Sequence, residues 1–327
     1  LRDYPNAETG PQLKIDEYKN VLNVLADSKP SIQIQGGEPT YFPKFVELVE
    51  YIRYELNLVV GFTTNGTLLD ENKIERLSKC NLGVTISLDG MQEKHDKIRG
   101  IGNFKVTSEC IERFISKKKN NNGLFVSSLF CIHEDNFDDM ERLADFTLNK
   151  LKVDTQTMSY YIFKNSESLS LHEKWRINNN LGEEFKIKLQ SGGDCSNKDF
   201  SKLNTRKIFD SHMKLKEKFG DRINFEPDFK TLDDLDSYFF SHKVMPDYFN
   251  YDSCGPSLFS ISLVSNGDIL FYPQCFEIKL GNIRKTNIKQ IWNGKQMKDI
   301  RKILKNGLSP VCAHCCANRI NKVSPFV

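Results

Sequence analysis

The stretch SIQIQGGEPT, residues 31–40, decides the fold class of this chain. Apolar and polar residues alternate up to Gln35, which predicts a β-strand that ends at the pair Gly36 and Gly37. Glycine lets the backbone turn sharply and approach a ligand closely. Carbonyl and amide groups at such a turn can hold an amino group, and Glu38 adds a negative charge. Taken alone, however, a glycine pair indicates only a strand-to-helix turn.

Strands and helices alternate along the chain on either side of this stretch. Apolar stripes at helical spacing predict helices over 14–26 and 43–56. Further strands are expected at 58–63, 82–88, 124–132, 155–163 and 223–225, and further helices at 70–79, 106–118, 207–219 and 232–240, with one more ending near Leu151. This alternation predicts a parallel sheet with helices outside it, so the expected fold class is α/β.

Three further polar motifs follow the ends of expected strands. They are TTNGT at 63–67, SLDG at 87–90 and HDKIRG at 95–100. Each has a plain explanation as a turn or a surface charge. The carboxyl ends of parallel strands meet at one edge of a sheet, however, and such edges carry the sites of α/β proteins. The four motifs together therefore predict one ligand site.

Cysteines gather near the C-terminus, around an Asn-Gly hairpin signal at residues 265–267. A helix is expected at 288–304, between the hairpin and the last cysteines. Nine cysteines in a long chain without a secretion signal indicate metal ligation rather than disulfides. Four thiolates suit a tetrahedral zinc ion or a [4Fe–4S] cluster, and spacing alone leaves both open. The five cysteines of this group are Cys254, Cys275, Cys312, Cys315 and Cys316.

Composition excludes some classes of function. The net charge of +3 gives no sign of a nucleic-acid partner, and the basic block at 117–119 indicates the solvated end of a helix. No apolar run reaches the length of about eighteen residues that a membrane span needs. We therefore expect no nucleic-acid partner, no membrane span and a reducing, cytoplasmic location.

The four strand-end motifs resemble those of radical S-adenosylmethionine (radical SAM) enzymes that carry a SPASM or shortened "twitch" domain. The resemblance covers residues 30–165 and 250–319. It implies a partial (β/α)6 TIM-like barrel followed by a small cysteine-rich domain with a β-hairpin and a helix. It also implies that the GGEP segment holds the amino group of SAM, that Ser87 and Arg99 contact its ribose and carboxylate, and that three further residues are neighbours. The implied SAM-binding residues are Gln35, Gly36, Gly37, Glu38, Pro39, Thr64, Asn65, Ser87 and Arg99.

The resemblance also favours iron–sulfur over zinc at the cysteine group, because LGNI at 280–283 and IWN at 291–293 match the twitch pattern. Seven residues separate Gly267 from Cys275, where the family usually has four. No cysteine follows Cys316, which implies one auxiliary [4Fe–4S] cluster rather than two. The implied ligands are Cys254, Cys275, Cys312 and Cys315, with Cys316 as a spare thiol or a substitute for Cys315.

The defining radical SAM motif, C-x-x-x-C-x-x-C, does not occur in these 327 residues. We expect the radical SAM cluster, its catalytic ligands and the first barrel strand upstream of Leu1; the alternative is a degenerate protein that has lost the chemistry. The expected domains are a barrel core at 1–165, the completion of the barrel with connecting helices at 166–250, and the auxiliary-cluster domain at 251–327.

The resemblance implies an enzyme that cleaves SAM to a 5′-deoxyadenosyl radical, which abstracts hydrogen from a substrate. One auxiliary cluster favours oxidative or tailoring chemistry on a small molecule of the sugar or aminocyclitol kind. A maturase of ribosomal peptides is the alternative within this class, and a non-catalytic zinc or iron–sulfur scaffold is the alternative outside it. A reducing partner such as flavodoxin or ferredoxin is expected.

Overall fold

The computed structural model describes most of the chain. The described residues are 11–119, 121–164, 166–186, 200–241, 254–271, 278–305 and 307–315. The chain forms two compact units. We call residues 18–160 and 203–228 the barrel unit, and residues 1–17, 161–202 and 229–327 the cysteine-rich unit.

The barrel unit is built on a parallel sheet whose described strands follow one another in chain order. The strands are β1 (Ile32–Ile34), β2 (Val60–Thr64), β3 (Gly83–Ser87), β4 (Phe125–Ile132), β5 (Thr155–Tyr160) and β6 (Ile223–Glu226). Every neighbouring pair is parallel, and the order never reverses. A doubly wound sheet reverses its strand order at a switch point, whereas a β/α barrel does not. The expected partial (β/α)6 barrel is confirmed, with β1 and β6 as its edges.

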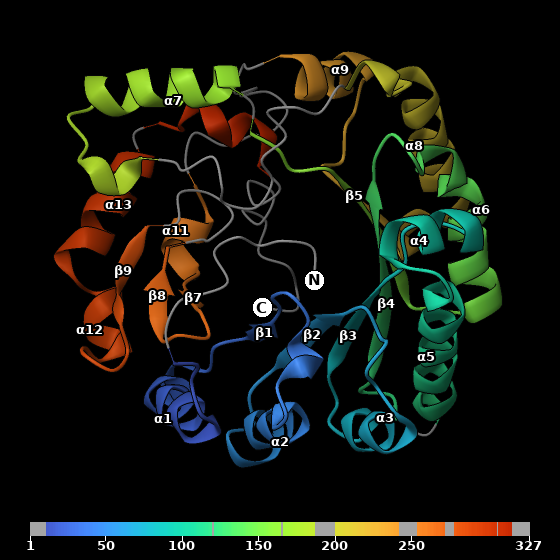
Figure 1. Ribbon diagram of the computed structural model, residues 1–327, viewed down its shortest axis with the longest axis horizontal. Coiled ribbons are helices and arrows are strands. Elements are labelled where there is room, and N and C mark those ends of the chain that lie inside the picture. Colours follow the sequence, from blue (N-terminus) through green and yellow to red (C-terminus); the bar gives the residue numbers. More distant parts are fainter. Residues whose placement is uncertain are drawn as a thin grey trace. The chain divides into compact units, whose positions relative to one another are not determined.

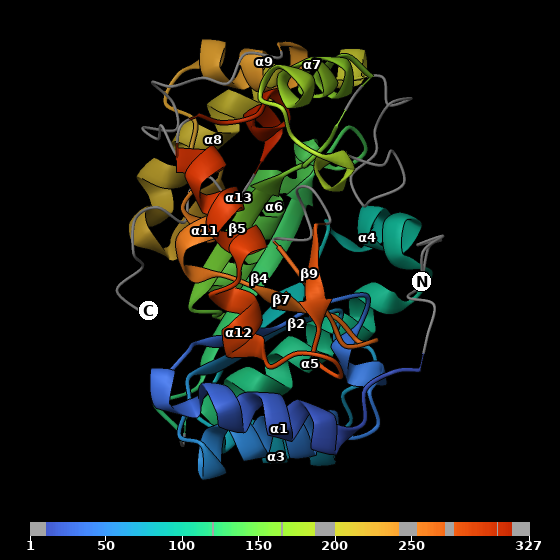
Figure 2. The same ribbon diagram turned by 90° about the vertical axis from the view of Figure 1, so that its left-hand side faces the viewer.

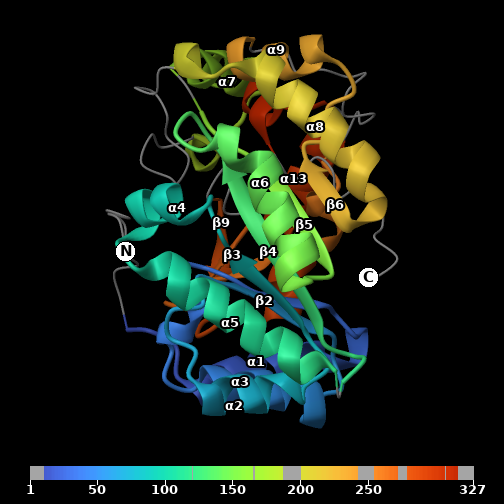
Figure 3. The same cartoon turned by 90° about the vertical axis from the view of Figure 1, so that its right-hand side faces the viewer.

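Helices connect these strands and cover one side of the sheet (Figure 1). They are α1 (Ile15–Leu25), α2 (Phe45–Glu50), α3 (Glu71–Ser78), α4 (Gln92–Arg99), α5 (Asn103–Lys118), α6 (Met140–Asp145) and α8 (Thr205–Phe219), with π-helical turns at Tyr51–Glu55 and Phe146–Leu151. Figure 3 shows α5 and α6 along the outer side of β3, β4 and β5. No helix in the described ranges is long and apolar enough to cross a bilayer.

The two faces of the sheet differ in chemistry. Phe62 in β2 and Phe130 in β4 have no exposed surface, and Phe62 packs edge-to-face on Phe45 of α2, so the apolar face lies under the helices. The opposite face is polar and partly buried. Its residues include Gln33, Thr63, Thr85, Ser127, Thr157, Ser159 and Glu226. Burial of the apolar face stabilises the barrel. The polar face is not needed for this packing, so it is the face on which we expect a functional site.

The cysteine-rich unit contains a small antiparallel sheet, which Figure 2 shows next to helices of the same unit. Its strands are β7 (Ser262–Leu263), β8 (Asp268–Leu270) and β9 (Lys279–Asn282). Its helices include α7 (Ser166–Asn178), α9 (Leu232–Phe240), α11 (Pro256–Phe259), α12 (Ile288–Trp292) and α13 (Lys295–Lys305), with 3₁₀ turns at Glu183–Phe185, Phe200–Lys202 and Pro310–His314. The hairpin between β7 and β8 is confirmed, and Gly267 takes the positive φ of 89° that its turn needs.

Several local predictions differ from the structure. The sequence reasoning missed α4 and α7, which lack a strong apolar stripe. The helix expected at 288–304 is two helices, because the chain breaks at Asn293 and Gly294 between α12 and α13. A Cβ on Gly294 would lie 3.1 Å from the carbonyl oxygens of Gln290 and Ile291, so a larger residue would strain this break.

Candidate functional site

Glu38 is the buried centre of the glycine-rich turn after β1. Its Oε1 accepts hydrogen bonds from the backbone N–H of Thr40 at 3.1 Å and from the hydroxyls of Thr40 and Thr64 at 2.6 and 2.7 Å. Its Oε2 accepts from the backbone N–H of Asn65 at 2.7 Å. Three of these hydrogen bonds end on Oε1 and one on Oε2, so Oε2 keeps one acceptor position. Glu38 therefore clamps the end of β1 to the end of β2.

The neighbouring backbone is left for a ligand. Gln35, Gly36 and Gly37 are exposed, and a Cβ on Gly36 would meet no atom within 4 Å. Pro39 begins a 3₁₀ turn, Pro39–Tyr41, that continues from the Glu38 cap. In this arrangement the carbonyl groups of the exposed turn, and the second acceptor position of Glu38 Oε2, could accept hydrogen bonds from an ammonium group.

The turn after β2 holds Thr64 and Asn65 in fixed positions. The Thr64 hydroxyl accepts from the N–H of Gly66 at 3.0 Å while it donates to Glu38. The Asn65 side-chain oxygen accepts from the N–H and the hydroxyl of Thr67 at 2.8 and 2.7 Å. Both side chains thus form the turn that borders the glycine-rich segment.

Ser87 ends β3, and Arg99, the last residue of α4, is bonded to Asp89, which follows β3. Ser87 is buried as the last residue of β3. The Nε of Arg99 donates to Oδ2 of Asp89 at 2.5 Å, and the Asp89 side chain is only 5% exposed. Within the described part of the chain, the two terminal nitrogens of Arg99 have no hydrogen-bond partner. A guanidinium group whose two terminal nitrogens can still donate suits bidentate binding of a carboxylate.

Asp89 also connects three chain segments. Its Oδ1 accepts from the N–H of Cys131 in β4, and its own N–H donates to Nδ1 of His95 in α4, both at 3.0 Å. Its carbonyl oxygen accepts from the Asn136 side chain at 3.2 Å. The sequence reasoning treated Asp89 as a turn residue. The one signal for its pairing with Arg99 is that the two opposite charges lie ten residues apart.

His95 is fully buried beneath this turn. Because Nδ1 accepts from Asp89, the proton of the neutral ring sits on Nε2, which is buried without a hydrogen-bond partner. Burial, opposed by the nearby Asp89 carboxylate, lowers the pKa of His95 from 6.5 to about 4. The ring is therefore neutral at pH 7.

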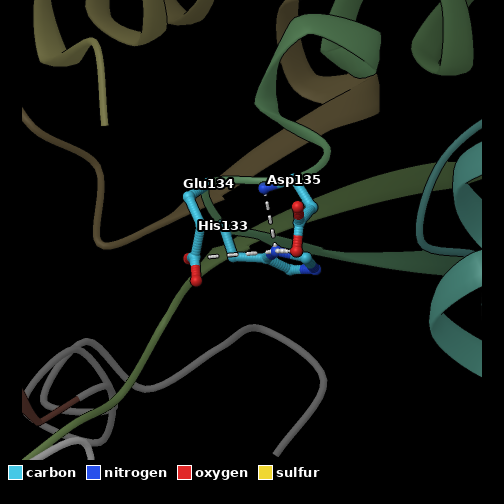
Figure 4. Close-up of side chains that lie close together, drawn as sticks. All are labelled: His133, Glu134 and Asp135. Atoms are coloured by element: carbon cyan, nitrogen blue, oxygen red, sulfur yellow. Dashed lines mark hydrogen bonds and ion pairs between the residues drawn. The ribbon is translucent and has the colours of Figure 1, made fainter. Parts of the chain in front are cut away.

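His133, Glu134 and Asp135 form a compact group after β4 (Figure 4). Their possible ligand atoms lie within 4.8 Å of one another. The Nδ1 of His133 accepts from the N–H of Asp135 at 3.2 Å, and Lys97 lies 3.2 Å from the Asp135 carboxylate. Since Lys97 already supplies a positive charge, we interpret this group as closing a turn rather than holding a metal.

The predicted auxiliary ligands Cys254, Cys312 and Cys315 come together in one buried apolar group of the cysteine-rich unit. Cys275 and Cys316 lie outside the described residues. The N–H of Cys254 donates to the carbonyl of Leu304 in α13 at 3.3 Å. Burial and the neighbouring Cys315 raise the pKa of Cys254 to about 11, and burial holds the pKa of Cys312 well above its usual value.

These three buried thiols are a suitable ligand set for a metal centre. A [4Fe–4S] cluster offers a separate iron to each thiolate, whereas a single zinc ion would bind the sulfurs directly with bonds of about 2.3 Å. The positive charge of the irons would remove the thiol protons that burial retains.

Two family profiles match the chain. Residues 254–316 match the SPASM family, an iron–sulfur cluster-binding domain. Residues 3–147 match the radical SAM superfamily. Residues 3–147 thus form a radical SAM domain, and residues 254–316 form a SPASM domain. The two domains imply SAM, a [4Fe–4S] radical SAM cluster and an auxiliary iron–sulfur cluster, which confirms the expected cofactors.

Curated relatives of this radical SAM chain match parts of it. Fe-coproporphyrin III synthase of Methanosarcina barkeri is 30% identical over 171 residues, which are 50% of this chain and 41% of that protein. The cysteine-type anaerobic sulfatase-maturating enzyme of Clostridium perfringens is 36% identical over 106 residues, which are 29% of this chain and 28% of that enzyme. The chain thus spans less than half the length of these relatives.

A solved structure shares the fold over nearly the whole chain. Streptococcus suis SuiB bound to S-adenosylmethionine has a TM-score of 0.64 at 18% identity, and the match covers 98% of this chain and 70% of SuiB. At this identity the likeness concerns the fold alone. It supports the radical SAM barrel and the small antiparallel sheet of the cysteine-rich unit.

Proposed function

We propose that this radical SAM protein is an enzyme that modifies a peptide or protein substrate. The observation that carries the proposal is the pairing of a radical SAM barrel with a SPASM domain in a chain related to a sulfatase-maturating enzyme. The fold likeness extends to SuiB bound to its precursor peptide SuiA, with a TM-score of 0.62. These relatives favour the peptide alternative over the small-molecule substrate first expected.

The residues at the strand ends have distinct roles in this proposal. The carbonyls around Gly36 and Gly37 would accept hydrogen bonds from the ammonium group of SAM, and Glu38 holds the turn that carries them. Arg99, held by Asp89, would bind the carboxylate, and Ser87 would bind the ribose. When bound, SAM and its [4Fe–4S] cluster supply the radical chemistry, and the protein supplies orientation.

The polar face of the barrel sheet suits an extended substrate. Thr157, Ser159 and Glu226 lie on neighbouring strands, with Thr157 and Ser159 in register with Asn224 and Glu226. Hydroxyls and carboxylates in such a row can bind the N–H groups of a peptide backbone. This face therefore offers a set of acceptors on β5 and β6, and Leu129 and Cys131 of β4 lie in register beside Thr157 and Ser159.

We further propose one auxiliary cluster, held by Cys254, Cys275, Cys312 and Cys315, with Cys316 as the alternative to Cys315. A small reductant such as flavodoxin or ferredoxin supplies electrons, and the cysteine content favours a reducing, cytoplasmic location. The domains proposed at 1–165, 166–250 and 251–327 remain predictions from the sequence.

The test is turnover of SAM by the full-length protein. After anaerobic reconstitution with iron and sulfide, the reduced protein is mixed with SAM and with short peptides encoded beside its gene. We expect one 5′-deoxyadenosine for each modified peptide, counted by chromatography and peptide mass. An enzyme that makes 5′-deoxyadenosine but leaves every peptide unchanged contradicts the peptide substrate, and one that cleaves no SAM contradicts the enzyme itself.

A small-molecule substrate is the second candidate. The relative matched over 171 residues is named Fe-coproporphyrin III synthase, which favours chemistry on a tetrapyrrole or a similar molecule. Adding iron coproporphyrin or its precursors to the same assay distinguishes the two, because only the true substrate class raises 5′-deoxyadenosine yield above the background of uncoupled cleavage.

A further inference from the structure

The cysteine-rich unit carries a concentration of positive charge that no contiguous motif reveals. Residues 284–305 contain eight Lys and Arg residues and one Asp, a net charge of +7, whereas the whole chain carries +3. On α13, lysines recur at residues 295, 298, 302 and 305, which is the spacing of one helical face. We call Lys298, Lys302 and Lys305 the lysine face.

The lysine face is exposed, and its positive charges are not neutralised by ion pairs in the described ranges. All three side chains are exposed, and no carboxylate within the described ranges forms an ion pair with them. Lys295 differs, because its ammonium lies 2.7 Å from Asp299. Lys285 and Lys289, just before α13, are likewise exposed and unpaired in the described part of the chain. Lys117 of α5, by contrast, is paired with Glu71 and Glu75.

The opposite face of α13 packs on the auxiliary cysteines. Met297, Ile300 and Leu304 are buried in the same apolar group as Cys254, Cys312 and Cys315, and Leu304 accepts the N–H of Cys254. One helix therefore separates the lysine face from the proposed cluster ligands. A helix with its side chains is only about 10–12 Å across.

We propose that the lysine face is the docking surface for an acidic one-electron carrier protein that exchanges electrons with the auxiliary cluster. A carrier cannot touch buried cysteines, so it must approach over a thin covering layer, and α13 is such a layer. Redox encounters are small and weak, and charge complementarity accelerates them. In each event one electron moves between carrier and cluster, and no bond forms or breaks.

The proposal rests on the auxiliary cluster that the SPASM domain implies, and not on the nature of the substrate. The test therefore measures electron transfer and not turnover. The chain is reconstituted anaerobically with iron and sulfide, and stopped-flow absorbance follows its oxidation state after mixing with a reduced plant-type [2Fe–2S] ferredoxin, which serves as the acidic carrier. The test variant is K298E, K302E, K305E.

We expect the triple variant to be reduced at least tenfold more slowly than the unchanged chain at low salt, since electrostatic steering raises association rates by about 10- to 1,000-fold. The unchanged chain should slow as salt rises, and the variant should not. A matched control, K29E, K119E, K202E, alters three exposed lysines elsewhere by the same net charge and should behave as the unchanged chain.

Two further measurements show whether each variant holds its cluster: the iron content and the rate of reduction by dithionite, which must be equal in all variants. If the glutamate variant binds less iron, K298Q, K302Q, K305Q replaces it as the test variant. Equal ferredoxin rates in the test and control variants overturn the proposal. A variant that keeps its ferredoxin rate but loses binding of an acidic peptide also overturns it, because the face would then bind substrate.

Discussion

At the scale of single residues, Asp89 is the residue that most changes the interpretation of the site. Sequence reasoning placed Arg99 at the SAM carboxylate, and the structure adds the carboxylate that holds the arginine through Nε alone. Asp89 is itself held by the N–H of Cys131 in β4. The proposed contact with SAM therefore depends on a positioning residue that touches no ligand.

Replacing Asp89 by Asn should weaken SAM binding about tenfold, or about 1.4 kcal/mol, because the neutral amide no longer anchors Arg99 through a charge-assisted hydrogen bond. Isothermal titration of the variant with SAM under anaerobic conditions measures the change. Arg99→Ala and the double variant D89N, R99A complete a cycle. If Asp89 acts through Arg99, the double variant binds SAM no more weakly than Arg99→Ala; additive losses contradict the positioning role.

His95 makes stability depend on pH. The pKa of His95 is about 4 in the folded protein, against an ordinary value of 6.5, so on acidification the unfolded chain takes up the proton first. The free energy of unfolding is therefore highest above pH 6.5, and it falls as the pH drops toward 4. Urea unfolding should lose about 2 kcal/mol between pH 7 and pH 5 from this one group.

The matched variant is His95→Asn, whose side-chain oxygen can still accept from the N–H of Asp89. It should be less stable at pH 7 because the ring is lost from a buried position, but its stability should fall less between pH 7 and pH 5. Parallel pH profiles for the two proteins would show that the pKa of His95 is the same in the folded and the unfolded chain.

At the scale of elements, strand ends and one amphipathic helix organise the function. The turns after β1, β2 and β3 carry the proposed SAM residues, because parallel strands bring their carboxyl ends to one edge. In the cysteine-rich unit, α13 packs its apolar face on Cys254, Cys312 and Cys315 while it exposes the lysine face. The same helix thus covers the proposed cluster and presents charge to solvent.

The cysteine ligands are tested by iron content. In the full-length protein, the double variant C312A, C315A should lose about four iron atoms after reconstitution, because two of four thiolates cannot hold a [4Fe–4S] cluster. The control is C80A, C110A, which removes two thiols that are buried in the barrel unit. If the two variants bind the same amount of iron, Cys312 and Cys315 are not ligands of the cluster.

At the scale of the whole molecule, charge is distributed unevenly. A net charge of +3 conceals a segment, 284–305, that carries +7, so the remainder of the chain is net acidic. The sequence reasoning noted only the contiguous block at 117–119, where Lys117 and Lys118 prove to be paired with carboxylates. Lysines spaced at the helical period do not form a contiguous run in the sequence, and they share one surface only when the helix forms.

The sequence by itself determined the order of strands and helices, the strand-end motifs and the cysteine group, because periodicity, turn residues and ligand spacing are local properties. Only the tertiary structure decided which partners those residues contact. Glu38 faces inward because it meets Thr64, 26 residues away, and Arg99 is held because Asp89 meets Cys131, 42 residues away. Such contacts depend on the register of neighbouring strands, which no single stretch of sequence contains.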